Sequence, residues 1–228
     1  VLGAEPVLFH ITNESSDFYN DGHGLVKKIN KDTCPEIITS FISQVVRMYA
    51  TKYFPDEICM PSDIDMLILN KEWFTEQIKD ISDNDLIIMD SKAYDLERPE
   101  CRAHNESCEN RYPICYNIAK GSTFNKILNT DRPFSQYVYE LSLLKLGWGT
   151  DELYFGDQIH TKNHGINIIK LIRNYTTPWA AEKRINRDIL YDENHLKTGY
   201  YIDFHCPRPY SDYKIEINKI INTSKKYV

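Results

Sequence analysis

The chain has 228 residues, of which 42% are hydrophobic and 26% charged, an ordinary composition for one sizeable globular domain. Its formal net charge of −6 argues against a nucleic-acid binder that works through a broad basic surface. No apolar run approaches the roughly 20 residues of a membrane span. We therefore expect no nucleic-acid partner and no membrane span in this chain.

The hydrophobic patterns predict strands that alternate with helices. In chain order the predicted elements are a strand over 5–11, a helix over 33–54, a strand over 65–70, a helix over 71–81, strands over 85–90 and 114–121, helices over 122–129 and 133–146, strands over 165–172 and 199–205, and a helix over 211–227. This alternation predicts an α/β domain with a mainly parallel central sheet flanked by helices. No repeat or linker divides the chain, so we expect a single domain over 1–228, with 91–113 as a polar surface insertion.

The clearest helix has a predicted start. Thr33 and Glu36 have the spacing of a capping box, and Pro35 lies near the first turn. At a later helix, Ser122 is placed to act as the N-cap of the segment over 122–129.

The ends of the chain and the cysteines bear on the compartment. The first residues lack the basic and apolar regions of a signal peptide, which favours the cytoplasm, whereas four glycosylation sequons leave a Golgi or secretory lumen as the alternative. The six cysteines form no Cys-x-x-Cys pair, which speaks against a structural zinc site. The sequence leaves open whether two of Cys101, Cys108 and Cys115 form a disulfide.

Two aspartates interrupt an apolar segment. Asp63 and Asp65 follow the approach over 57–60 and precede the strand over 65–70. Carboxylates at i and i+2 of a strand end or tight turn can converge on one hard cation, which suits Mg²⁺ or Mn²⁺ holding a diphosphate. The other interpretation is that Ser62 or Asp63 caps a turn while Asp65 is solvated.

Five segments occur in an order that is typical of one family. They are TSFISQVVRMYA (39–50), SDIDMLILNKEWF (62–74), RYPICYNIAKGSTF (111–124), GWGTDELYFGDQI (147–159) and YIDFHCPRPY (201–210). Together they resemble the glycosyltransferase domains of large DNA viruses and similar protist sequences, such as the chlorovirus domain that glycosylates the major capsid protein. The resemblance implies a GT-A fold, a role in glycan biosynthesis such as viral capsid glycosylation, and the host cytoplasm as location. The chain begins at what fits the second strand of such domains, so no base-binding residues are assigned.

The resemblance assigns the donor side of a site. It implies that Asp63 and Asp65 are the Asp-x-Asp metal pair, with Asp65 binding the ion most directly and Asp63 contacting the metal or the ribose. The late segment implies His205 as the third ligand and Arg208 as a diphosphate contact. Imidazole suits Mn²⁺ better than Mg²⁺, so the expected cofactors are Mn²⁺ (or Mg²⁺) and a nucleotide sugar, with UDP as the favoured nucleotide. Without the resemblance, His205 fits a satisfied histidine at a strand end.

The resemblance also assigns a base. The segment GWGTDE resembles the Trp-Gly-acid segment of inverting galactosyltransferases, which implies that Asp151 or Glu152 accepts the proton of the acceptor hydroxyl, with Asp151 favoured. Trp148 would then form a floor for a sugar ring. The same residues fit a helix start, with Thr150 as N-cap and both acids favourably placed for the helix dipole, and the two interpretations can hold together.

Four further positions complete the predicted site. The resemblance implies that Arg47 faces the nucleotide or supports the aspartates, although an ordinary exposed helix arginine fits equally well. Asn117 is the expected polar contact to the donor sugar, and Lys120 and Gly121 are weaker candidates.

The sequence thus predicts a metal-dependent glycosyltransferase that moves a sugar from a nucleotide sugar to a glycan or protein acceptor with inversion. One alternative is a metal-dependent phosphohydrolase or nuclease, which would need further carboxylates such as Asp90, Asp151 and Asp157 to hold two ions. Another is a non-catalytic carbohydrate-binding module, for which 16 Tyr and 3 Trp could supply sugar platforms.

Overall fold

The structure is a computed structural model that describes residues 3–13, 24–92, 111–162, 165–172, 175–177, 180–181 and 183–224. In chain order its helices and strands are β1 (Val7–Thr12), β2 (Leu25–Asn30), α1 (Thr39–Tyr49), β3 (Ile58–Cys59), β4 (Met66–Ile68), α2 (Lys71–Ile78), β5 (Asp85–Ile88), β6 (Ile118–Lys120), α4 (Gly121–Leu128), α5 (Phe134–Leu143), α6 (Thr150–Thr161), β7 (Asn167–Lys170), β8 (Tyr175–Thr177), β9 (Ala180–Ala181), β10 (Arg184–Ile185), α7 (Glu193–Lys197), β11 (Asp203–His205) and α8 (Tyr210–Ser224). The central part of the predicted 91–113 insertion lies outside the described residues.

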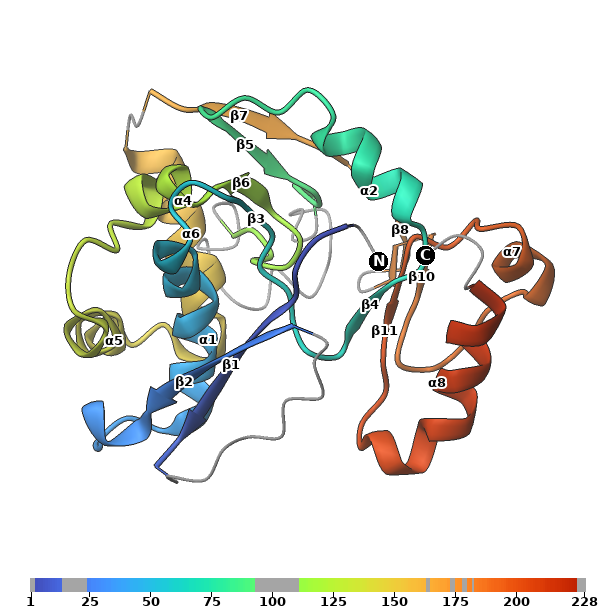
Figure 1. Cartoon of the computed structure of the whole chain (residues 1–228), viewed down its shortest axis with the longest axis horizontal. Coiled ribbons are helices and arrows are strands. Elements are labelled where there is room, and N and C mark those ends of the chain that lie inside the picture. The colour runs from blue at the N-terminus through green and yellow to red at the C-terminus, as the bar shows by residue number, and fades with distance from the viewer. Residues whose placement is uncertain are drawn as a thin grey trace.

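Two sheets form the framework (Figure 1). The larger has the order β3-β6-β5-β7, in which β5 and β7 are parallel while β6 is antiparallel to both of its neighbours. In the smaller sheet, of order β10-β11-β4, the first pair is parallel and the second antiparallel. The α/β class is confirmed, but the mainly parallel sheet is wrong. Alternation of strands and helices along the chain does not fix the direction of the strands. Two neighbouring strands of a sheet can be parallel or antiparallel, depending on how the chain connects them.

Strand β5 of the larger sheet is buried on both faces. Leu86 and Ile88 of β5 belong to a core cluster with side chains of α1, α4, α5 and α6. Ile87 points the other way and belongs to a second cluster with Phe74 of α2. A strand covered on both sides reads as a continuous apolar run, which is how this segment reads in the sequence.

The smaller sheet has a core of its own. Ile185 of β10 and Phe204 of β11 pack with Ile217 and Ile220 of α8, which lies along this sheet in Figure 1. The cluster of Ile87 and Phe74 also includes Met66 of β4, so apolar contacts join the two halves of the fold, and the segment between β3 and β4 carries the chain from one half to the other.

Two predicted features of the N-terminal part are wrong. Helix α1 begins at Thr39, and its N-cap, Ile38, makes no side-chain capping bond. Thr33 instead ends a 3-10 turn, where its hydroxyl donates to the carbonyl oxygen of Asn30 at 2.7 Å, and it lies six residues before the start of α1. The sequence analysis also missed β2, which pairs in parallel with β1.

The first residue of α4 lies tightly against the turn that follows α1. The amide N–H of Gly121 donates to the carbonyl oxygen of Glu57 at 2.8 Å. A Cβ atom on Gly121 would lie 2.0 Å from the carbonyl oxygen of Phe54 and 2.8 Å from that of Thr51. Lys120 is the N-cap and makes no side-chain capping bond, so the prediction that Ser122 caps this helix is wrong. Gly121 thus has a packing role.

We expect Gly121→Ala to lower the free energy of unfolding by about 1–3 kcal/mol, because backbone oxygens would have to move to admit the methyl group. The loss should appear although alanine is the better helix former. Urea unfolding followed by circular dichroism measures it, with the exposed neighbour Ser122→Ala as control. An equal effect of the two substitutions would contradict the packing role.

Candidate functional site

The aspartate pair lies in a turn that leads into β4. The carbonyl oxygen of Asp63 accepts a hydrogen bond from the amide of Met66 at 3.1 Å, and that of Asp65 accepts one from the amide of Cys206 at 2.7 Å. The antiparallel pairing of β4 with β11 sets Met66 opposite His205. The late histidine is thereby held beside Asp65, although the two are far apart in the sequence.

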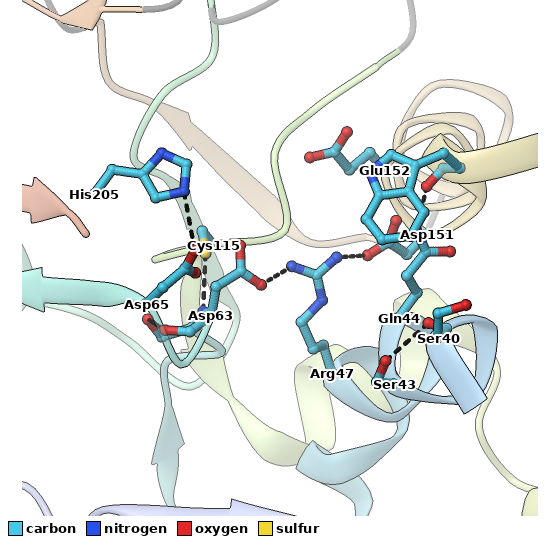
Figure 2. Close-up of polar contacts among 12 residues, drawn as sticks. Ser40, Ser43, Gln44, Arg47, Asp63, Asp65, Cys115, Asp151, Glu152 and His205 are labelled. Atoms are coloured by element: carbon cyan, nitrogen blue, oxygen red, sulfur yellow. Dashed lines mark hydrogen bonds and ion pairs between the residues drawn. The ribbon is translucent and has the colours of Figure 1, made fainter. Parts of the chain in front are cut away.

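The two carboxylates have different partners, as Figure 2 shows. The carboxylate of Asp63 pairs with Arg47, whereas Asp65 lies 3.4 Å from Nε2 of His205. The chain turns at Ile64 and Asp65, so the side chains do not keep the common direction of a regular strand.

Cationic side chains surround one oxygen of Asp65. Oδ2 accepts hydrogen bonds from Nε of Arg208 at 2.7 Å and from Nη2 of Arg187 at 2.9 Å. Burial by itself would raise the pKa of Asp65, but hydrogen bonds from His205, Arg208 and Arg187 bring it well below its usual range. Asp65 therefore stays ionised. Its second oxygen, Oδ1, is buried and has no hydrogen-bond partner.

Arg47, in the last turn of α1, joins the turn before β4 to helix α6. Nη1 pairs with Oδ1 of Asp63 and Nη2 pairs with Oδ2 of Asp151 (Figure 2). Burial alone would lower the pKa of Arg47, but the charges of Asp151 and Asp63 raise it overall, so the guanidinium stays charged. The prediction that Arg47 supports the aspartates agrees with this contact, and the alternative of an exposed helix arginine is wrong.

Asp151 lies in the first turn of α6, and its side chain is only 1% exposed. Burial raises its pKa to about 6, an effect that the Arg47 charge opposes and the nearby Glu152 reinforces. The N-cap of this helix is Gly149, and the hydroxyl of Thr150 donates back to the carbonyl oxygen of Gly147 at 2.7 Å. The predicted capping role of Thr150 is therefore wrong, because Thr150 is the first residue of the helix and the N-cap makes no side-chain capping bond.

The second acid of this turn has its own arginine. Oε2 of Glu152 accepts a hydrogen bond from Nε of Arg111 at 2.8 Å. The same guanidinium packs on Gly149, where a Cβ atom would lie 3.1 Å from it. Glu152 and Asp151 are thus held by different arginines that come from different parts of the chain.

Helix α1 also fixes the segment in front of Asp151. The side-chain amide of Gln44, one turn before Arg47, donates to the carbonyl oxygen of Trp148. Gln44 is buried, whereas the Trp148 side chain is 76% exposed. The backbone at Trp148 is thereby held, and its accessible indole lies three residues before the buried carboxylate.

The segment after the predicted insertion packs against the aspartate turn. Sγ of Cys115 lies 3.1 Å from the amide nitrogen of Asp63, and the amide of Tyr116 donates to the carbonyl oxygen of Pro61 at 2.7 Å. Cys115 is a free thiol, while Cys101 and Cys108 lie outside the described residues. Asn117 is buried and its amide donates to the carbonyl oxygen of Pro113 at 2.6 Å, so its described contact is with its own segment.

The remaining weak candidate is explained by an ion pair. Nζ of Lys120 lies 2.6 Å from Oδ2 of Asp83. The ion-pair partner of Lys120 is therefore Asp83 and not the aspartate pair. Sequence reasoning missed Arg187 and Arg111. Arg187 follows the very short strand β10, and only the pairing of β10 with β11 and of β11 with β4 brings it to Asp65.

The donor atoms present suit a hard divalent cation. Carboxylate oxygens and an imidazole are ligands for Mn²⁺ or Mg²⁺, and the orphaned, buried Oδ1 of Asp65 is an acceptor with an unused lone pair. Across the described residues, however, no three His, Cys, Asp or Glu side chains are already grouped around one point. Asp63 is turned to Arg47, and it would have to leave that arginine to join Asp65 and His205.

Comparison with protein-family models, curated proteins and solved structures gives no significant match for this chain. Within the part of the chain that the structure describes, no helix has the length and apolar character needed to cross a bilayer. The function is therefore argued from the contacts of the site itself.

The raised pKa of Asp151 predicts a pH dependence of stability. Its folded-state pKa of about 6 exceeds the ordinary 3.8, so the fold favours the protonated carboxyl. That contribution is complete below the ordinary pKa and is lost as the pH rises through the folded one. We expect Asp151→Asn to gain about 1–3 kcal/mol in unfolding free energy relative to the unsubstituted chain between about pH 4 and about pH 7. The unfolding free energies of both proteins would be measured by denaturation at several pH values in that range. A difference between the two proteins that does not change with pH would contradict the prediction.

Proposed function

We propose that the chain is a metal-dependent glycosyltransferase of the GT-A type. It would transfer a sugar from a nucleotide sugar, with UDP as the favoured nucleotide, to a hydroxyl of a glycan or protein acceptor with inversion. The observation that carries the proposal is a connected charge cluster: the Asp-x-Asp pair, two arginines and a histidine on one side, joined through Arg47 to a buried carboxylate on the other.

The donor side is suited to a diphosphate. Arg187 and Arg208 converge on one oxygen of Asp65, so the local cationic charge exceeds that of the single carboxylate they share. Guanidinium groups match phosphate oxygens in geometry and charge, and these two can contact a diphosphate bound next to Asp65. A divalent ion held by Asp63, Asp65 and His205 would supply further neutralisation of the leaving diphosphate.

The acceptor side is suited to proton removal. The pKa of about 6 leaves Asp151 ionised at neutral pH yet basic enough to accept a proton. The acceptor hydroxyl gives its proton to the Asp151 carboxylate while its oxygen bonds to the anomeric carbon. The bond from that carbon to the diphosphate breaks, and its electron pair stays with the diphosphate. Trp148, exposed three residues earlier, offers a face on which an acceptor sugar ring can stack.

Two substitutions separate these roles. Asp65→Asn should abolish Mn²⁺-dependent binding of the nucleotide sugar in calorimetry, because the ionised carboxylate is lost. Asp151→Asn should keep donor binding but lower transfer by about 10²-fold or more, because an amide cannot accept the proton. Release of nucleoside diphosphate together with a glycosylated acceptor measures the transfer.

Asp157→Asn serves as the control, since this carboxylate is exposed on α6, the helix that also carries Asp151. It should leave both binding and transfer close to those of the unsubstituted protein. Unchanged donor affinity in Asp65→Asn would remove the metal claim. Full transfer by Asp151→Asn would assign the base to another residue.

A further inference from the structure

Arg47 makes two ion pairs whose partners differ in burial. The Asp63 side chain is 37% exposed, whereas that of Asp151 is 1% exposed. Each partner takes a different nitrogen of the guanidinium, Nη1 for Asp63 and Nη2 for Asp151. One cation therefore serves two carboxylates that the proposed function assigns to opposite sides of the reaction.

The difference in burial decides which pair is released more easily. An exposed carboxylate can exchange a guanidinium for water or another cation at little free-energy cost. A buried carboxylate that loses its cation is left as an uncompensated charge in the interior, which is strongly unfavourable. The Arg47–Asp63 pair is thus the one that can open while the Arg47–Asp151 pair persists.

We infer that Arg47 is a positioning residue that couples the donor side to the base by competing with a divalent cation for the Asp63 carboxylate. While Arg47 holds Asp63, that carboxylate is turned away from Asp65 and His205. When Asp63 binds a divalent cation in place of Arg47, the guanidinium pairs with Asp151 alone and fixes the direction of the Asp151 carboxylate. This inference rests on the proposed function and adds a regulation of the same site.

Coupling of this kind has opposite consequences for binding and for turnover. Loss of the Arg47 side chain removes the competitor, so metal binding should become tighter. The same loss removes the group that orients Asp151, so transfer should become slower. A residue with a merely structural role would weaken both, which makes the pair of directions diagnostic.

The binding test compares Asp151→Asn with the double variant Arg47→Met/Asp151→Asn, which avoids a buried charge without a partner. Titration of Mn²⁺ into both in a calorimeter should show roughly fivefold tighter binding to the double variant. Arg111→Met/Asp151→Asn removes the same charge from the arginine that pairs with Glu152, and should change the affinity much less. Equal or weaker Mn²⁺ binding by the double variant overturns the inference.

The kinetic test uses Arg47→Lys, because one ammonium group can serve Asp151 but lacks the fork that reaches both carboxylates. Its Mn²⁺ affinity should rise while kcat falls by about tenfold or more. If the unsubstituted protein binds Mn²⁺ through Asp65 and Arg47→Lys shifts neither quantity in this way, the inference fails and the proposed function stands. If the unsubstituted protein binds no Mn²⁺ at all, the proposed function fails and the inference fails with it.

Discussion

The negative charge of a buried carboxylate must be neutralised by a nearby cation, and at this site that cation is a single arginine. Asp151 is almost fully enclosed at the start of α6, and the guanidinium of Arg47 on α1 lies against it. Because neither charge can be left alone in the interior, the pair fixes α6 relative to α1. The other half of the same guanidinium holds Asp63, so the turn before β4 is tied to the same point.

The second constraint is the antiparallel pairing of β4 with β11. It carries Asp65 and His205 to one place and, through β10, brings Arg187 from a segment with no sequence signal of its own. The acids of the site are consequently neutralised by the protein's own cations. Binding a metal and a diphosphate there is an exchange of partners: carboxylates pass from arginine to metal, and arginines pass from carboxylate to phosphate.

The structural features that could be predicted from the sequence are those set by local patterns. The apolar period of α1 and the continuous apolar run of β5 lie where the patterns predicted them. Asp63 and Asp65 lie just before β4, as predicted, but their side chains have different partners. The start of α1 was predicted too early, because the residues around Thr33 form a local 3-10 turn instead. Strand direction could not be predicted, because it depends on pairings between distant segments. Arg111 and Arg187 escaped notice for the same reason: a lone arginine becomes part of a site only through tertiary contacts.

The central claim is that this charge cluster binds a metal–diphosphate unit, and thermal unfolding of the unsubstituted protein tests it most directly. Melting temperatures would be measured with Mn²⁺ alone, with each of several nucleoside diphosphates alone, and with both together. The account predicts that one diphosphate, with UDP the first candidate, raises the Tm by about 5 °C or more at saturation only when Mn²⁺ is present. A Tm that no diphosphate shifts, with or without Mn²⁺, would contradict it.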